Sequence, residues 1–137
     1  MANKRSIPVL FTAAEIKERV EALAGEIAAK LPSDFLIVSL LRGSFMFTAD
    51  LVRELYAVGI HPQIDFMTLS SYGEGSKSSG NVAVGRDITD DVKGRTVLIV
   101  DDILETGRTL RYAHDLLIER GAADVKIVML LEKPNKL

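Results

Sequence analysis

The chain has 137 residues, of which 47% are apolar and 26% are charged. This length suits one domain with one ordinary hydrophobic core, and we expect residues 1–137 to form it. The formal net charge of -2 provides no overall positive field to attract nucleic acid, and no run approaches the roughly 20 apolar residues of a membrane span. Cysteine is absent, which excludes disulfide bonds and thiol catalysis. We expect a soluble cytoplasmic protein that binds neither nucleic acid nor membrane.

The first predicted element is an amphipathic helix. Thr12 and Glu15 have the spacing of a capping box, and Pro32 is placed to end the helix. Apolar residues recur between them at spacings of three or four, which favours one buried helical face. This stripe consists of Ile16, Val20, Leu23, Ile27 and Leu31.

A strand and a second helix follow. Phe35–Leu41 is an apolar run whose only polar residue is Ser39, as is typical of a strand covered on both faces. Ser44 is a suitable N-cap for the helix, and Gly59 is placed to end it. The apolar residues of this helix are Phe45, Phe47, Leu51, Val52 and Leu55.

The rest of the chain predicts four more strands and one helix. The strands are expected at Ile64–Leu69, Val82–Val84, Thr96–Val100 and Val125–Leu131, and the helix at Thr109–Arg120, closed by Gly121. Residues 70–80 are rich in Ser and Gly and predict a flexible hairpin loop. The alternation of strands and helices predicts an α/β fold, a mostly parallel twisted sheet with helices on both faces, and ligands at the carboxyl ends of its strands.

Residues with chemical potential concentrate between Val97 and Leu110. Asp101 and Asp102 end a buried strand, and their mutual repulsion is tolerable if a cation or hydroxyl donors converge on them, as a ribose diol with magnesium would. The chain then turns into a helix, so amides and hydroxyls between Thr106 and Thr109 can face one anion at the helix N-terminus. The triphosphate-binding motif G-x-x-x-x-G-K-S/T is absent. The plainer alternative is an acidic strand end followed by an ordinary capped helix.

The run VLIVDDILETGRTL, residues 97–110, resembles the phosphoribosyl-pyrophosphate (PRPP) signature of type I phosphoribosyltransferases. LLRGSFMFTADL, residues 40–51, and DFMTLSSYG, residues 65–73, resemble the hypoxanthine-guanine members of that family, and the resemblance covers nearly the whole chain. It implies the type I phosphoribosyltransferase fold and transfer of the phosphoribosyl group from PRPP to hypoxanthine or guanine in purine salvage. It also implies Mg²⁺ as cofactor and a homo-oligomer, either a dimer or a tetramer.

The resemblance assigns the PRPP-binding residues. Asp101 and Asp102 would hold the ribose hydroxyls and the magnesium ion. Arg42 and Gly43 match the pyrophosphate-binding loop, which in this family often contains a cis peptide bond between non-proline residues, and a guanidinium can grip a phosphate with two donors. The alternative for Arg42 is an exposed arginine in a glycine turn. The 5′-phosphate is assigned to Glu105, Thr106, Gly107, Arg108 and Thr109.

The resemblance also assigns the residues around the base. Glu105 stands where the family usually has Asp, the general base at N7 of the purine; alternatively, it only favours the helix dipole. Lys133 matches the lysine that donates to the exocyclic oxygen of a 6-oxopurine, and its alternative is an exposed lysine at a strand end. Ser71 and Tyr72 match the mobile loop that closes over the reacting centre, although a simple hairpin tip is equally compatible.

Family members continue for several dozen residues beyond this lysine, whereas this sequence stops at Leu137. We therefore expect either a shortened enzyme, with its carboxyl-terminal purine-binding segment absent, or a base pocket completed from elsewhere. Three other functions are alternatives. They are a phosphoribosyltransferase for another base such as xanthine or adenine, a non-catalytic nucleotide-sensing regulator that binds RNA on the same fold, and a signalling receiver domain. The order of the acidic pair and the strands disfavours the receiver, and the near-neutral charge disfavours the RNA-binding regulator.

Overall fold

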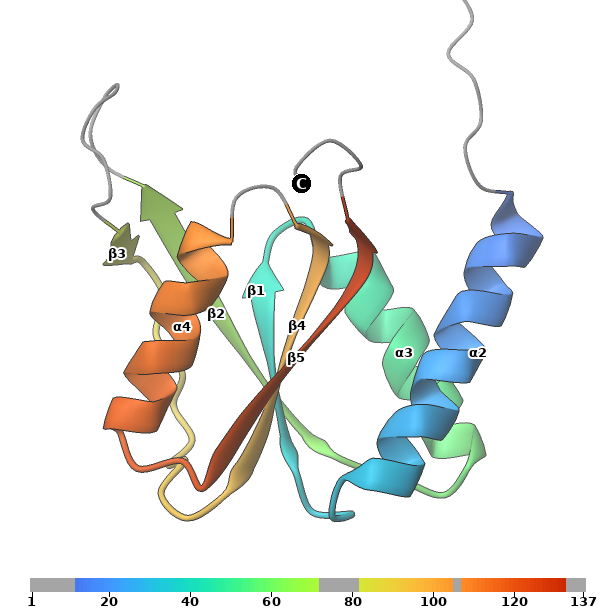
Figure 1. Ribbon diagram of the computed structural model, residues 1–137, viewed down its shortest axis with the longest axis horizontal. Helices are drawn as coiled ribbons and strands as arrows, with labels where there is room; N and C mark the ends of the chain where they lie inside the picture. Colours follow the sequence, from blue (N-terminus) through green and yellow to red (C-terminus); the bar gives the residue numbers. More distant parts are fainter. Residues whose placement is uncertain (1–11, 72–81, 105–106, 133–137) are drawn as a thin grey trace, which may run out of the picture.

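Helices and strands alternate along the computed structural model, which describes residues 12–71, 82–104 and 107–132 (Figure 1). The elements are α2 (Ala13–Lys30), β1 (Leu36–Leu41), α3 (Phe45–Ala57), β2 (Gln63–Ser71), β3 (Val82–Val84), β4 (Thr96–Leu104), α4 (Arg108–Glu119) and β5 (Asp124–Glu132). Every helix and strand expected from the sequence is present, and β4 extends further than expected because it continues through the acidic pair. Most of the expected hairpin loop at 70–80 lies outside the described residues.

The strands form one sheet in the order β3-β2-β1-β4-β5. The pairs β1–β2, β1–β4 and β4–β5 are parallel, and only the β2–β3 pair is antiparallel. This confirms the predicted mostly parallel sheet. The carboxyl ends of the four parallel strands therefore lie along one edge, which is uppermost in Figure 1, and α4 begins at the same edge.

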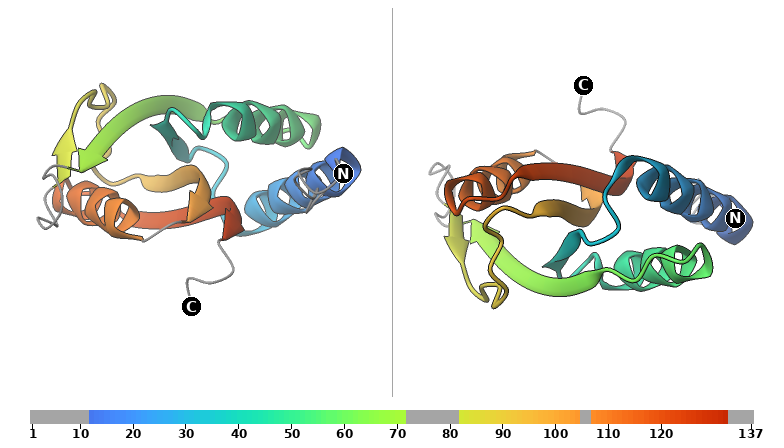
Figure 2. Two further views of the ribbon diagram at one scale, coloured as in Figure 1. Left: turned by 90° about the horizontal axis from the view of Figure 1, so that it is seen from above. Right: turned by 90° about the horizontal axis from the view of Figure 1, so that it is seen from below.

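Helices cover both faces of the sheet, as predicted (Figures 1 and 2). On one face, α2 and α3 pack on inward side chains such as Ile37 and Val100. On the other face, α4 packs on residues of opposite parity, such as Val38 and Ile99. This alternation explains why β1 and β4 are apolar at nearly every position, because each successive side chain enters a different core layer.

A split between β1 and β4 opens the carboxyl edge of the sheet. The β1–β2 ladder continues to the pair Leu41–Thr68, whereas the β1–β4 ladder ends at Ser39–Val100. The chain leaves β1 toward β2 on one side and later returns through β4 to β5 on the other. The strand order reverses here, and such switch points are where open α/β sheets bind ligands.

At the starts of α2 and α3, one expectation from the sequence is confirmed and two are corrected. The capping box of α2 is formed, since Glu15 N–H donates to Thr12 Oγ1 over 3.1 Å and Thr12 N–H to Glu15 Oε1 over 2.8 Å. Ser44 is the N-cap residue of α3, as expected, but its hydroxyl accepts no helix N–H and instead donates to the Leu40 carbonyl. Phe45, expected on the apolar face, is 57% exposed because it lies about 200° around the helix from the buried Phe47.

None of the helices in the described ranges is long and apolar enough to cross a membrane.

Candidate active site

The acidic pair lies just beyond the point where β4 parts from β1. Asp101 and Asp102 follow Val100, the last β4 residue paired with β1, and both side chains are partly buried. The Asp102 N–H donates to Asp101 Oδ1 over 2.9 Å. Burial raises the pKa of Asp101 to about 6, and repulsion by the Asp102 carboxylate adds to the rise, although the Asp102 N–H bond opposes it. A partly buried carboxylate with a raised pKa is a common electrostatic mark of a functional site.

The turn after β1 comes directly against this pair. The backbone of Gly43 is so close to Asp102 that an added Cβ would lie 2.8 Å from Oδ2 and 3.3 Å from Oδ1. The Leu41–Arg42 peptide bond is cis, in the loop where the family resemblance anticipates one. Arg42 is exposed at this edge. The structure thus brings together the two segments that the sequence assigned separately to pyrophosphate and to ribose.

The amino end of α4 faces the same edge. Gly107 is the N-cap residue in the left-handed conformation, with φ of 82°, and its carbonyl accepts from Arg111 N–H over 2.8 Å. Arg108 is exposed and Thr109 is partly buried. The first turn of α4 contains no acidic residue and Gly107 has no capping side chain, which suits an anion at a helix N-terminus.

Four of the predicted site residues lie outside the described residues: Tyr72, Glu105, Thr106 and Lys133. Ser71 ends β2, and the chain leaves β5 at Glu132. Both strands run parallel to β1 and β4, so β2 and β5 end at the edge that carries Asp101 and Asp102.

A set of buried hydroxyl groups at this edge was missed by sequence reasoning. Ser39, Ser44 and Thr48 are each at most 4% exposed and are hydrogen bonded to one another. The signals were present, because Ser39 interrupts an apolar strand and Thr48 follows Ser44 by one helical turn. Ser44 was instead interpreted as a helix cap, which accounted for its side chain without reference to Ser39.

The donor set at the acidic pair fits Mg²⁺. Within the described ranges, no group of three or more His, Cys, Asp or Glu side chains is arranged to hold a metal ion. Mg²⁺, however, is commonly held by one or two carboxylates together with water and substrate phosphates. Asp101 and Asp102 supply hard oxygen donors, and a cation beside them would relieve the repulsion that raises the pKa of Asp101.

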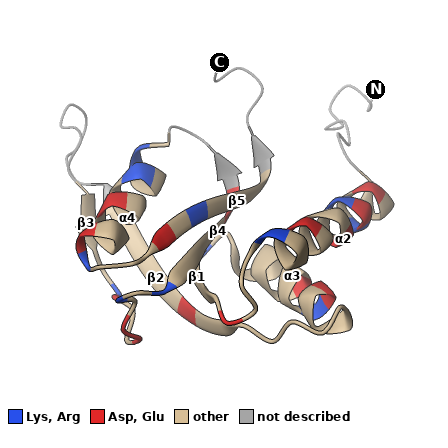
Figure 3. Ribbon diagram, turned by 60° about the horizontal axis from the view of Figure 1, so that its bottom comes forward, with Lys and Arg blue, Asp and Glu red and all other residues tan. Residues whose placement is uncertain are grey.

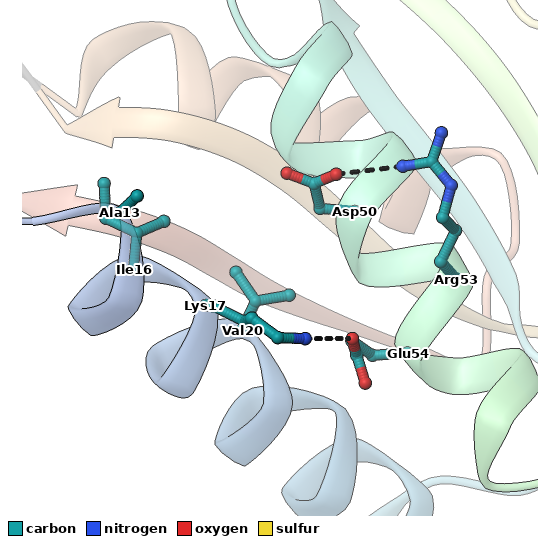
Figure 4. A pocket seen from close by; sticks show the side chains of 7 residues that line it. All are labelled: Ala13, Ile16, Lys17, Val20, Asp50, Arg53 and Glu54. Atoms are coloured by element: carbon teal, nitrogen blue, oxygen red, sulfur yellow. Dashed lines mark hydrogen bonds and ion pairs between the residues drawn. The ribbon is translucent and has the colours of Figure 1, made fainter.

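Charges on the helices α2 and α3 are mixed in sign. Figure 3 shows acidic and basic residues interspersed along both helices. A groove of about 430 Å³ lies between them (Figure 4), and none of the predicted site residues lines it. Its charges neutralise one another, with Lys17–Glu54 at 3.7 Å and Arg53–Asp50 at 3.0 Å. This groove therefore offers no second cluster of reactive groups.

Comparison with known proteins shows the family to which the chain belongs. The profile of the phosphoribosyl transferase domain family matches residues 11–137. Hypoxanthine phosphoribosyltransferase of Escherichia coli K12 is 40% identical over 136 residues, 97% of this chain and 75% of that protein. Hypoxanthine-guanine phosphoribosyltransferase of Lactococcus lactis is 49% identical over 119 residues, 87% of this chain and 61% of that protein. The crystal structure of a hypoxanthine phosphoribosyltransferase from Staphylococcus aureus superposes with a TM-score of 0.87 at 35% identity, covering 98% of this chain and 72% of that one.

Proposed function

This chain belongs to the phosphoribosyl transferase family and, within it, to the hypoxanthine phosphoribosyltransferases, and on that premise we propose that it transfers the phosphoribosyl group of PRPP to hypoxanthine or guanine. In this reaction N9 of the purine displaces pyrophosphate from C1 of the ribose, giving IMP or GMP. The observation that carries the proposal is the contact between Gly43 and Asp102 at the switch point of the sheet. It joins an acidic pair suited to a ribose diol to a turn suited to pyrophosphate.

The acidic pair binds the ribose and the metal. Asp101 and Asp102 accept hydrogen bonds from the 2′- and 3′-hydroxyls, which orients C1 toward the purine. When bound, Mg²⁺ neutralises charge on the pyrophosphate leaving group. The partial burial of the two carboxylates strengthens these contacts, since water competes less there than at an open surface.

The pyrophosphate and the 5′-phosphate of PRPP bind on either side of the pair. Gly43 lets the backbone approach the pyrophosphate, and the exposed guanidinium of Arg42 donates to it. The 5′-phosphate lies at the amino end of α4, where amides and hydroxyls of Thr106, Gly107, Arg108 and Thr109 donate and the helix dipole favours a negative charge.

The remaining roles follow from the family resemblance. Glu105 manages the proton at N7 of the purine, and Lys133 donates to the exocyclic oxygen and so rejects a 6-amino group. Ser71 and Tyr72 cover the reacting centre and keep water from the positively charged ribosyl carbon. A cytoplasmic location and a homo-oligomeric state, a dimer or a tetramer, remain predictions.

The function is tested by incubating the purified chain with PRPP and Mg²⁺ and each of hypoxanthine, guanine, xanthine and adenine. We expect IMP from hypoxanthine or GMP from guanine, each with one equivalent of pyrophosphate, and no product from adenine. Nucleotide is measured by chromatography and pyrophosphate by a coupled assay. Preferred use of xanthine or adenine would show that the enzyme is specific for another base. If none of the four purines gives a nucleotide, the proposal is wrong.

Replacing Glu105 tests the proposed base. Glu105→Gln keeps the length of the side chain but cannot take a proton, so we expect kcat to fall by at least about 10²-fold while the Kd for PRPP changes by less than about threefold. Glu105→Asp, which restores the residue usual in the family, is the matched control and should retain most of the activity. Steady-state kinetics and calorimetric titration with PRPP provide the two readouts. Unchanged turnover in Glu105→Gln would show that Glu105 is not the general base.

A further inference from the structure

Three buried hydroxyl groups connect β1, the turn after it and α3. Ser39 Oγ lies 2.7 Å from Ser44 Oγ and 2.7 Å from Thr48 Oγ1. Ser39 and Ser44 are 0% exposed and Thr48 is 4% exposed, so water does not compete for these bonds. The cluster adjoins Gly43, whose backbone lies against Asp102.

The direction of the hydrogen bonds follows from counting protons. Ser44 donates its single hydroxyl proton to the Leu40 carbonyl. Ser39 must then donate to Ser44, which leaves Thr48 to donate to Ser39. The result is a one-way chain from Thr48 through Ser39 and Ser44 to Leu40, and it attaches the residue after Gly43 to the end of β1.

Packing alone does not require these hydroxyls. Ser39 is the only polar residue of β1, and the cluster lies beside an apolar core in which alanine or valine would fill similar space. A buried hydrogen bond adds only about 1 kcal/mol of net stability. Hydrogen bonds are directional, however, so a chain of them fixes the position of the turn more precisely than apolar contacts do.

We propose that Ser39, Ser44 and Thr48 are positioning residues that hold the Arg42–Gly43 backbone at its place against Asp102 and thereby set the affinity for the pyrophosphate group of PRPP. The inference rests on the proposed function. It extends that function from residues that touch the substrate to buried residues that do not. The expected effect is selective: the affinity for ligands that lack pyrophosphate should not depend on the three hydroxyl groups.

The test centres on variants of one residue of α3. Thr48→Val keeps the shape of the side chain and removes the hydroxyl, whereas Thr48→Ser keeps the hydroxyl and removes a methyl group. Thr96→Val makes the same chemical change at a partly buried position that begins β4, at the opposite edge of the sheet from the cluster, and is the matched control. Ser39→Ala removes the middle hydroxyl and serves as an independent second variant, also covering the case in which Thr48→Val does not fold.

Three quantities are measured for each variant: the KM for PRPP in the forward reaction, the KM for pyrophosphate in the reverse reaction from IMP, and the Kd for IMP alone. For Thr48→Val and Ser39→Ala we expect both KM values to rise about tenfold, with the Kd for IMP within about twofold of wild type. Thr48→Ser should restore both KM values to within about threefold, and Thr96→Val should match wild type.

Unchanged KM values in Thr48→Val and Ser39→Ala would overturn the inference. Equal weakening of IMP binding and pyrophosphate binding would also overturn it, because that result indicates a general structural role. A Thr48→Ser variant that is as impaired as Thr48→Val would overturn it as well. Failure of the proposed function is recognised separately, because wild type would then form no nucleotide and bind no PRPP.

Discussion

Gly43 lies against Asp102 and so joins the turn after β1 to the acidic pair. A Cβ added here would lie 2.8 Å from a carboxylate oxygen of Asp102, closer than a Cβ carbon approaches an oxygen unless one of the two groups shifts. Asp102 belongs to β4 and Gly43 to the turn after β1, so either the turn or the carboxylate must move if a methyl group is added. Glycine is therefore favoured here by the lack of space for a side chain and not by an unusual backbone angle.

We predict that Gly43→Ala raises the KM for PRPP at least about tenfold. The added methyl group displaces the turn or Asp102 and so disturbs two parts of the PRPP site together. Gly25→Ala is the matched control, because nothing lies within 4 Å of its added Cβ and alanine favours the helix. Steady-state kinetics measure the effect, and an unchanged KM for PRPP in Gly43→Ala would contradict the assignment of this turn.

Asp101 is a second residue whose environment favours function over stability. Burial raises the pKa of its carboxyl to about 6, from an ordinary value of 3.8, so ionised Asp101 weakens the ligand-free fold. The unfolded chain loses this proton near pH 3.8 and the folded chain near pH 6. Stability therefore declines as the pH rises through this window, and the full cost is present above about pH 6.

We predict that Asp101→Asn stabilises the ligand-free protein above about pH 6 by on the order of 1 to 3 kcal/mol and loses this advantage near about pH 4. Asparagine carries no charge, so it removes both the burial cost and the repulsion by Asp102. Denaturant unfolding in a chelator at a series of pH values measures the difference. Equal stability of the variant and wild type at a pH well above the Asp101 pKa would show that the ionised carboxylate does not destabilise the fold.

At the scale of elements, Asp65 fastens the segment before β4 to the sheet. This β2 side chain is 4% exposed, and its Oδ2 accepts from Thr89 N–H over 2.7 Å and from Asp90 N–H over 3.0 Å. Its Oδ1 accepts from Phe66 N–H over 2.8 Å. Burial alone would raise the pKa of Asp65, but these N–H donors outweigh it and the pKa is lowered. Arg86 lies 3.7 Å from the carboxylate and adds a weaker ion pair.

We predict that Asp65→Asn destabilises the protein by about 1–3 kcal/mol at neutral pH, because an amide nitrogen cannot accept the buried N–H groups. Since the folded-state pKa is lowered, the contribution of Asp65 is complete above about pH 4 and is lost as the pH falls further. The stability gap between wild type and variant should narrow accordingly. Asp124→Asn, which alters an exposed ion pair with Lys126, should cost less than about 0.5 kcal/mol in the same denaturant titration. If the difference in unfolding free energy between wild type and Asp65→Asn stayed the same in strong acid, the proposed role of the Asp65 carboxylate would be wrong.

At the scale of the molecule, ligand binding should be visible as added stability. We predict that PRPP with Mg²⁺ raises the thermal unfolding midpoint, since a ligand at about 100 times its Kd adds about 2.7 kcal/mol to the folded state. Chelation of Mg²⁺ should remove most of the shift, and the double variant Asp101→Asn with Asp102→Asn should remove it altogether. Differential scanning fluorimetry measures each case. An equal shift with and without the metal would contradict the assignment of these carboxylates.

The order of helices and strands was predictable because it depends on residues close together in the chain. The Thr12–Glu15 capping box and the apolar run of β1 are local patterns, and both formed as expected. The start of α4 shortly after the acidic pair was predictable for the same reason, since both lie in one continuous segment. The strand order β3-β2-β1-β4-β5 agrees with the α/β class, although the class alone does not specify that order.

Contacts between distant segments could not be derived from local patterns. The approach of Gly43 to Asp102 depends on β1 and β4 being neighbours whose ladder ends at Ser39–Val100. The side chain of Ser44 had two possible partners, a helix N–H group or a buried carbonyl, and only the folded geometry selected Leu40. The linear sequence thus specified the parts of the site and its chemical character. The fold decided which of those parts touch, because parallel pairing brings strand ends together regardless of the length of chain between them.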